Sequence, residues 1–135
     1  MALAEECCAL VGKALNIDAK DVLPASTGVI GQPMVIDPFA RGIPAAAEKQ
    51  AATAQGSTDA ATAIMTTDTH KKEYAIQFEL GGKVCTVGAI GKGSGMIAPN
   101  MATMLAFYTT DAAVSPILLE KALKTVVPGT YNQMS

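Results

Sequence analysis

The strongest candidate for chemistry in this chain is a threonine that follows a glycine-rich loop. Gly91, Gly93 and Gly95 lie within five positions, and glycine tolerates backbone conformations that bring the chain close to another group. Thr103 follows this loop, directly after Ala102. Its hydroxyl could attack the Ala102 carbonyl in an N-to-O acyl shift, and hydrolysis of the ester would cut the chain. The freed α-amine, with an ordinary pKa of about 8, would then act as base for its own hydroxyl, so no histidine is required.

Other interpretations of these residues stay open at this stage. A threonine after an alanine is most often an ordinary packed residue. The glycines lack the spacing of a P-loop and of the dinucleotide-binding fingerprint, which disfavours nucleotide binding. His70 is the only histidine and lies in the polar, turn-like run 68–72, so a histidine-dependent triad is disfavoured. Asp68 and Asp111 are interpreted as turn and cap residues rather than as catalytic acids.

Four further residues are candidates for binding. Thr27 and Gly28 lie in a small-residue turn, 26–31, whose backbone N–H groups could stabilise a developing oxyanion or simply form a turn. Thr66 follows a predicted strand and could bind a substrate or cap its own turn. Lys92 could neutralise a substrate carboxylate or extend into water.

Composition narrows the class of protein. The chain has 135 residues, of which 50% are hydrophobic, and this size and composition predict one domain. A net charge of −2 without a basic run disfavours nucleic acid and anionic membranes as partners. The apolar runs are too short to span a bilayer and the first residues do not resemble a signal peptide, so a soluble protein is expected. Cys7, Cys8 and Cys85 suggest neither a disulfide framework nor a zinc site, so we expect free thiols in a reducing compartment.

The first half of the chain is predicted to be mainly helical. Apolar residues at helical spacing predict an amphipathic helix over 2–15. A short extended piece is expected over 22–25, and the alanine content favours a helix over 39–54. Residues 55–58 are predicted to be a loop, and 61–65 a short buried strand.

The second half is predicted to contain a hairpin, a further strand and a helix. Strict alternation predicts a half-buried strand over 74–80, linked through Gly81 and Gly82 with positive φ to a second strand over 83–90. Residues 101–108 are expected to form a buried strand with Thr103 near its start. Ser115 is predicted to cap a helix that runs to about residue 127. The predicted class is α+β.

Three motifs in this order closely resemble the ornithine acetyltransferase family, also called bifunctional glutamate N-acetyltransferase: residues 25–31, 63–69 and 92–107. Family members are longer than this chain, so the resemblance implies an internal fragment that spans the self-cleavage point. The expected arrangement is a single partial domain over 1–135, in which 1–102 ends the α-chain and 103–135 begins the β-chain. The resemblance implies a layered α/β sandwich similar to that of self-processing proteins with an N-terminal nucleophile.

The resemblance also implies a role for each candidate residue. Thr103 matches the nucleophile that is exposed by cleavage, Thr27 and Gly28 match the oxyanion-stabilising pair, and Thr66 and Lys92 match substrate-binding positions. The implied reaction is a ping-pong transfer of an acetyl group from N2-acetylornithine to glutamate through an acetyl-threonine, in arginine biosynthesis in the cytoplasm. Some members also acetylate glutamate from acetyl-CoA, as a substrate; no metal or resident cofactor is expected.

The implied partners are small-molecule substrates and the second chain produced by cleavage, as an α/β heterodimer that oligomerises further. Two alternatives stay open on sequence grounds. One is a self-processing amidase or aminopeptidase of similar fold, which passes the acyl group to water. The other is an inactive structural fragment that requires further segments before any site exists.

Overall fold

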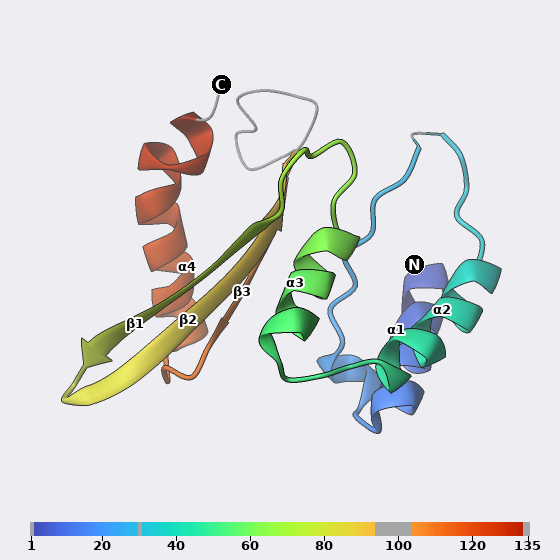
Figure 1. Cartoon of the computed structure of the whole chain (residues 1–135), viewed down its shortest axis with the longest axis horizontal. Coiled ribbons are helices and arrows are strands. Elements are labelled where there is room, and N and C mark those ends of the chain that lie inside the picture. The colour runs from blue at the N-terminus through green and yellow to red at the C-terminus, as the bar shows by residue number, and fades with distance from the viewer. Residues whose placement is uncertain (1, 30, 94–103, 134–135) are drawn as a thin grey trace. The chain divides into compact units, whose positions relative to one another are not determined.

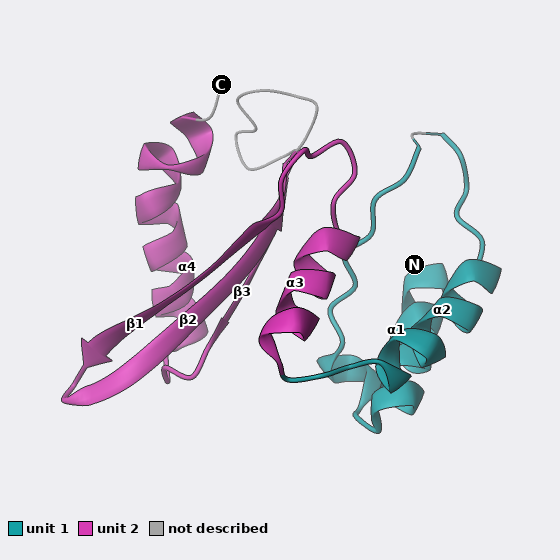
Figure 2. Cartoon of the chain, in the orientation of Figure 1, with its two compact units in different colours: residues 1–52 teal, residues 53–135 magenta. Residues whose placement is uncertain are grey.

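The computed structural model describes residues 2–29, 31–93 and 104–133 (Figure 1). The chain divides into two compact units, a first unit of residues 1–52 and a second unit of residues 53–135 (Figure 2). The single partial domain, and its division at residue 102, remain predictions.

The first unit begins with the predicted amphipathic helix. Helix α1 is Ala2–Leu15, as expected, and Leu3, Cys7 and Leu10 lie half-buried along one face. Asn16 adopts a φ of 55°, and Ile17 N then donates to Gly12 O at 3.0 Å. A left-handed residue followed by this hydrogen bond is a common way to end a helix, because it satisfies a carbonyl of the last turn.

The rest of the first unit contains the short 3₁₀ helix η1, Ala19–Asp21, and helix α2, Asp37–Glu48. Residues 22–25 belong to no helix or strand, in line with the predicted extended piece. The helix predicted over 39–54 is correct in type but wrong at its end, because α2 stops at Glu48.

The predicted loop over 55–58 and the predicted strand over 61–65 are wrong. Helix α3, Ala54–Ala63, replaces the first and most of the second. Thr53 caps this helix, because its Oγ1 accepts a hydrogen bond from Gly56 N at 3.0 Å. A short apolar run cannot be assigned to helix or strand from its periodicity alone, and here the cap and the alanines favour the helix.

The second unit is built around a three-stranded antiparallel sheet in the order β1-β2-β3. The strands are β1, Lys72–Leu80; β2, Lys83–Lys92; and β3, Leu105–Thr110. The predicted hairpin is confirmed, since Leu80 pairs with Lys83 and the two glycines between them have φ of 58° and 73°. The α+β class is therefore confirmed.

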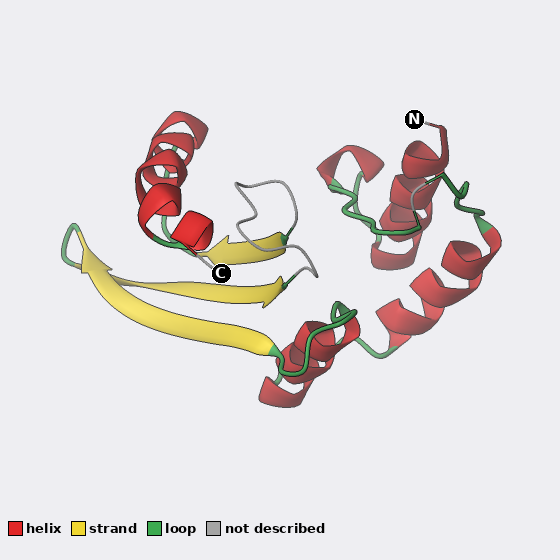
Figure 3. Cartoon of the chain, turned by 90° about the horizontal axis from the view of Figure 1, so that it is seen from above, coloured by secondary structure: helices red, strands yellow, loops and turns green. Residues whose placement is uncertain are grey.

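Two helices lie on opposite sides of this sheet, α3 on one and α4, Pro116–Val126, on the other (Figure 3). Helix α4 is confirmed with its predicted cap, because Ser115 Oγ accepts from Leu118 N at 3.4 Å. The 3₁₀ helices η2, Val127–Gly129, and η3, Tyr131–Gln133, follow. The strand predicted over 101–108 is confirmed as a strand from Leu105 onward, but the predicted burial is wrong, because Phe107 is 37% and Tyr108 53% exposed. Thr103, near the predicted start, lies outside the described residues.

Few side chains in the described residues are fully buried. The buried apolar residues are Ala61, Cys85 and Val127, of which Ala61 is 0% and Val127 2% exposed. Strand β1 was expected to be half-buried, but of its residues only Glu73 is partly covered, and Tyr74 is 72% exposed. The predicted half-burial is wrong because no described segment fully covers the side of β1 that carries its apolar side chains. Among the described residues no helix is long and apolar enough to cross a membrane.

Candidate functional site

The structure brings together two of the predicted substrate-binding residues. Thr66 lies in the turn between α3 and β1, and Lys92 is the last residue of β2. Lys92 Nζ donates a hydrogen bond to Thr66 Oγ1, although the two residues are 26 positions apart in the sequence. Lys92 is only 9% exposed. An ammonium group and a hydroxyl held side by side are suited to binding a carboxylate.

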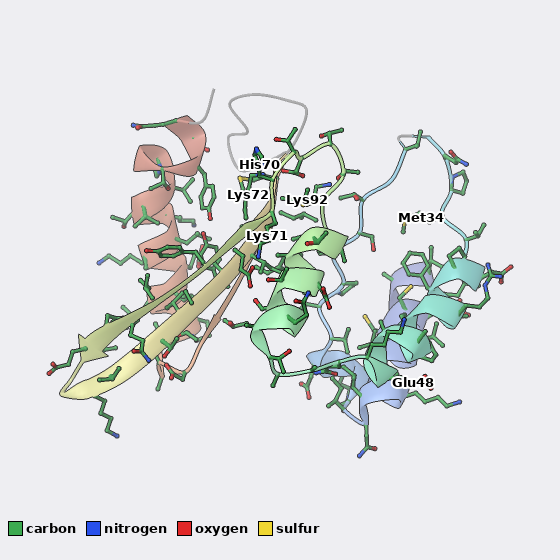
Figure 4. All side chains as sticks on the ribbon, in the orientation of Figure 1. Met34, Glu48, His70, Lys71, Lys72 and Lys92 are labelled. Atoms are coloured by element: carbon green, nitrogen blue, oxygen red, sulfur yellow. The ribbon has the colours of Figure 1, made fainter. Side chains whose placement is uncertain are left out.

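A third residue of the same turn holds the chain next to Lys92. Asp68 Oδ1 accepts hydrogen bonds from Gly93 N at 2.7 Å and from Lys72 Nζ at 2.5 Å. The Asp68 side chain is 3% exposed, and that of Lys72 is 52% exposed. Figure 4 shows Lys72 and Lys92 at the same end of the sheet.

The hydrogen bonds to Asp68 also set its protonation. The bond from Lys72, and next the bond from the Gly93 amide, lowers the pKa of Asp68 from 3.8 to about 2. The group is therefore a carboxylate at neutral pH. From the sequence, Asp68 was predicted only to be a turn residue. The one feature that could have indicated a larger role is that this charged residue belongs to the same motif as Thr66.

The other aspartate considered from sequence has a structural role, as expected. Asp111 follows β3, and its Oδ1 accepts from Thr86 N on β2 at 2.7 Å. His70 lies in the turn before β1, where its backbone carbonyl accepts from Lys72 Nζ at 3.2 Å. Its place in a polar turn agrees with the sequence prediction.

A second ion pair lies nearby on the α3 side of the sheet. Lys71 Nζ is 2.5 Å from Glu73 Oε2 and 2.8 Å from Thr58 Oγ1 on α3. The hydrogen bond from Lys71 and, after it, the one from Ser57 lower the pKa of Glu73. This pair joins α3 to β1, and Glu73 lines an open groove of about 520 Å³ between α3 and the three-stranded sheet. Sequence reasoning did not identify it.

Thr27 and Gly28 lie in the first unit, in a segment without helix or strand, and both are exposed. The tight turn comes just after them, where Gln32 N donates to Val29 O at 3.2 Å and Gly31 has a φ of 82°. Within the described ranges, neither the Thr27 nor the Gly28 amide donates a hydrogen bond. Both amides are thus available as donors.

The structure therefore brings only some of the candidate residues together. Thr66 and Lys92 are in direct contact, whereas Thr27 and Gly28 belong to the other compact unit. Ala102 and Thr103 lie outside the described residues. Among the residues that the structure describes, no cluster of histidine, cysteine or acidic side chains could hold a metal ion.

Comparison with known proteins shows what the chain is related to. A sequence model of the ArgJ family matches residues 1–135. The arginine biosynthesis bifunctional protein ArgJ of Symbiobacterium thermophilum is 48% identical over 132 residues, which cover 98% of this chain and 32% of that protein. The glutamate N-acetyltransferase of Methanothermobacter thermautotrophicus is 47% identical over 125 residues, or 92% of this chain and 31% of that protein.

A third relative gives the same result. The ArgJ protein of Synechococcus sp. is 46% identical over 132 residues, which are 98% of this chain and 31% of that protein. The chain thus spans about a third of the length of the curated relatives it matches. The match extends through the whole chain, including the turn with Thr66 and the strand end with Lys92. The chain therefore belongs to the ArgJ family.

Proposed function

We propose that the chain is part of an acetyltransferase that moves an acetyl group from N2-acetylornithine to glutamate, in arginine biosynthesis. The observation that carries this proposal is the family match over residues 1–135, with relatives named for arginine biosynthesis and for glutamate N-acetylation. The contact between Lys92 and Thr66 supports it, because both substrates are amino acids with a carboxylate to be bound. The activity belongs to the full-length protein.

In the proposed mechanism, the chain first cuts itself between Ala102 and Thr103. The new Thr103 α-amine takes the hydroxyl proton while Thr103 Oγ1 attacks the acetyl carbonyl carbon. The bond to the ornithine nitrogen then breaks, and ornithine leaves with a proton on that amine. Glutamate's amine attacks the acetyl-threonine ester, which yields N-acetylglutamate and restores the hydroxyl.

The other candidate residues stabilise and orient these steps. Thr27 and Gly28 donate their backbone N–H groups to the oxyanion of each tetrahedral intermediate, a contribution of about 3 to 4 kcal/mol per donor. Both residues are exposed and their amides make no hydrogen bond to another described residue, which supports this role. Lys92 and Thr66 bind the substrate carboxylate.

The finer architecture is part of the same proposal. The sheet, with α3 on one face and α4 on the other, forms part of a layered α/β sandwich, and a further segment covers the part of the apolar side of β1 that α4 leaves exposed. The exposure of Tyr74 (72%), Ile76 (45%) and Leu80 (51%) supports this, because a contiguous apolar strand face is normally covered. After cleavage the two chains remain associated as a heterodimer that oligomerises further, in the cytoplasm. No resident cofactor takes part, and acetyl-CoA serves as a second acetyl donor.

Mass spectrometry of a full-length family protein that carries residues 1–135 of this chain tests the proposal. We expect two polypeptides that separate between Ala102 and Thr103, and after mixing with N2-acetylornithine, one acetyl group on the peptide that begins with Thr103. Addition of glutamate should remove that acetyl group and yield N-acetylglutamate. Thr109→Ala, a threonine replacement on β3, should leave cleavage and labelling intact, whereas Thr103→Ala should abolish both.

Two results would contradict the proposal. One is a single uncut chain that still turns over. The other is release of ornithine at the same rate with and without glutamate, since a transferase needs its acceptor and a hydrolase does not.

A further inference from the structure

We propose that Asp68 is a positioning residue, which holds the backbone at Gly93 so that Lys92 meets Thr66 with its charge available for a substrate carboxylate. The inference rests on the proposed function of Lys92 and Thr66 as carboxylate-binding residues. It concerns a residue that itself does not touch the substrate.

One short turn holds both the side chain of Lys92 and the backbone of Gly93 at the end of β2. Thr66 Oγ1 accepts from the Lys92 side chain, and Asp68 Oδ1 accepts from the Gly93 backbone at 2.7 Å. Lys92 and Gly93 are consecutive, so the backbone bond limits where the Lys92 side chain can start. Asp68 is 3% exposed in its side chain, and water therefore competes little for these bonds.

The backbone at residue 93 lies very close to the Asp68 carboxylate. A Cβ atom added to Gly93 would lie 2.9 Å from Asp68 Oδ1, which is closer than carbon and oxygen atoms normally approach. Any side chain at position 93 would force the Asp68 carboxylate to shift away from the backbone. The glycine and the aspartate therefore form a matched pair, 25 residues apart in the sequence.

Lys72, and not Lys92, is the counterion of Asp68. Lys72 Nζ lies 2.5 Å from Asp68 Oδ1, and Asp68 is a carboxylate at neutral pH. Across the described ranges, no carboxylate oxygen lies within 4.0 Å of Lys92 Nζ. Lys72 thus neutralises the nearby aspartate, and Lys92 is left with an uncharged partner. A lysine in this state can pair with a substrate carboxylate without first giving up an internal ion pair.

The chain offers a matched control for the test. Lys71, just before β1, and Glu73, in β1, form an ion pair with the same 2.5 Å separation, but Glu73 binds Thr58 on α3 and not the Gly93 backbone. Glu73→Gln therefore removes a comparable charge from the same region of the fold without removing an acceptor of the Gly93 or Lys92 hydrogen bonds.

The experiment measures KM and kcat for N2-acetylornithine and for glutamate, together with the melting temperature, in a full-length family protein that carries residues 1–135. Asp68→Ala should reduce kcat/KM by about 10- to 100-fold, the size expected when a binding group is displaced by about 1 Å. Asp68→Asn should recover most of that loss, because its amide oxygen still accepts from Gly93. Glu73→Gln should stay within about 2-fold of the unmodified enzyme, since surface ion pairs contribute little.

Three outcomes would overturn the inference: an unchanged kcat/KM in Asp68→Ala, the same kcat/KM in Asp68→Asn as in Asp68→Ala, or losses in all variants that follow only their melting temperatures. If Asp68→Ala does not fold, Lys72→Met replaces it. This variant should raise KM because the released Asp68 competes for Lys92, and an unchanged KM would refute the inference. Failure of the unmodified protein to transfer acetyl would instead contradict the proposed function.

Discussion

The contact between Thr66 and Lys92 makes a quantitative prediction that a double-mutant cycle can test. The cycle consists of Thr66→Val, Lys92→Met and the double variant. Thr66→Val keeps the shape of the side chain but removes the oxygen that accepts from Lys92 Nζ. Lys92 is 9% exposed, so its ammonium group then depends on the limited water that can reach it past the exposed residue 66.

The expected cost follows from the type of bond. A hydrogen bond to a charged group contributes about 1.5 to 3 kcal/mol. Thr66 itself is exposed, so water replaces part of the lost bond and the lower figure, about 1.5 kcal/mol, applies. Lys92→Met removes the charge together with the need for a partner and should cost less than about 1 kcal/mol. The double variant should have a free energy of unfolding within about 0.5 kcal/mol of that of Lys92→Met.

Urea unfolding followed by tyrosine emission is a suitable assay. The chain has no tryptophan, and its three tyrosines, Tyr74, Tyr108 and Tyr131, all lie in the second unit, so the signal reports the part of the chain that contains the contact. With a slope of about 1 kcal/mol per molar urea for a unit of this size, Thr66→Val should lower the midpoint by about 1.5 M.

The exposed neighbour Thr67 supplies the control, because Thr67→Val makes the same chemical change one position away and should alter stability by less than about 0.5 kcal/mol. Simple additivity of Thr66→Val and Lys92→Met would refute the reasoning, since it would mean that the two side chains are not coupled. An equal effect of Thr66→Val and Thr67→Val would refute it as well.

Two further predictions follow from the geometry. Gly12→Ala should destabilise the first unit by about 1 to 3 kcal/mol, because its Cβ would lie 2.9 Å from Ile17 O. Gly42→Ala in α2 meets nothing within 4 Å and should stabilise the unit by up to about 1 kcal/mol. Thermal melts followed by far-UV circular dichroism compare the two variants, and equal effects would contradict the predicted clash at Gly12. The pKa of Asp68 is lowered in the fold from 3.8 to about 2, so its contribution is complete above about pH 4 and is lost as the pH falls towards 2. The free energy of unfolding, followed by tyrosine emission, should therefore fall less over that pH range in Asp68→Asn than in the unmodified protein. If it falls equally in both proteins, Asp68 is not the group responsible for the acid-induced loss of stability.

Much of the secondary structure could be predicted from neighbouring residues alone. The hairpin follows from Gly81 and Gly82, which allow the positive φ that the two-residue turn needs, and α4 follows from the Ser115 cap. Helix α3 was missed because its short run of alanine and polar residues has little periodicity, and the Thr53 cap that starts it was not recognised.

The sequence by itself determined the elements whose stability depends on close neighbours, together with the candidates Thr66 and Lys92. It did not reveal the role of Asp68, whose local pattern is that of an ordinary turn residue. Only the tertiary structure decided that Asp68 meets Gly93, 25 residues away, and that Lys72 takes up its charge while Lys92 binds Thr66. The physical reason is range: backbone preferences act over a few residues, whereas ion pairs and hydrogen bonds between distant segments exist only after the sheet has brought those segments together.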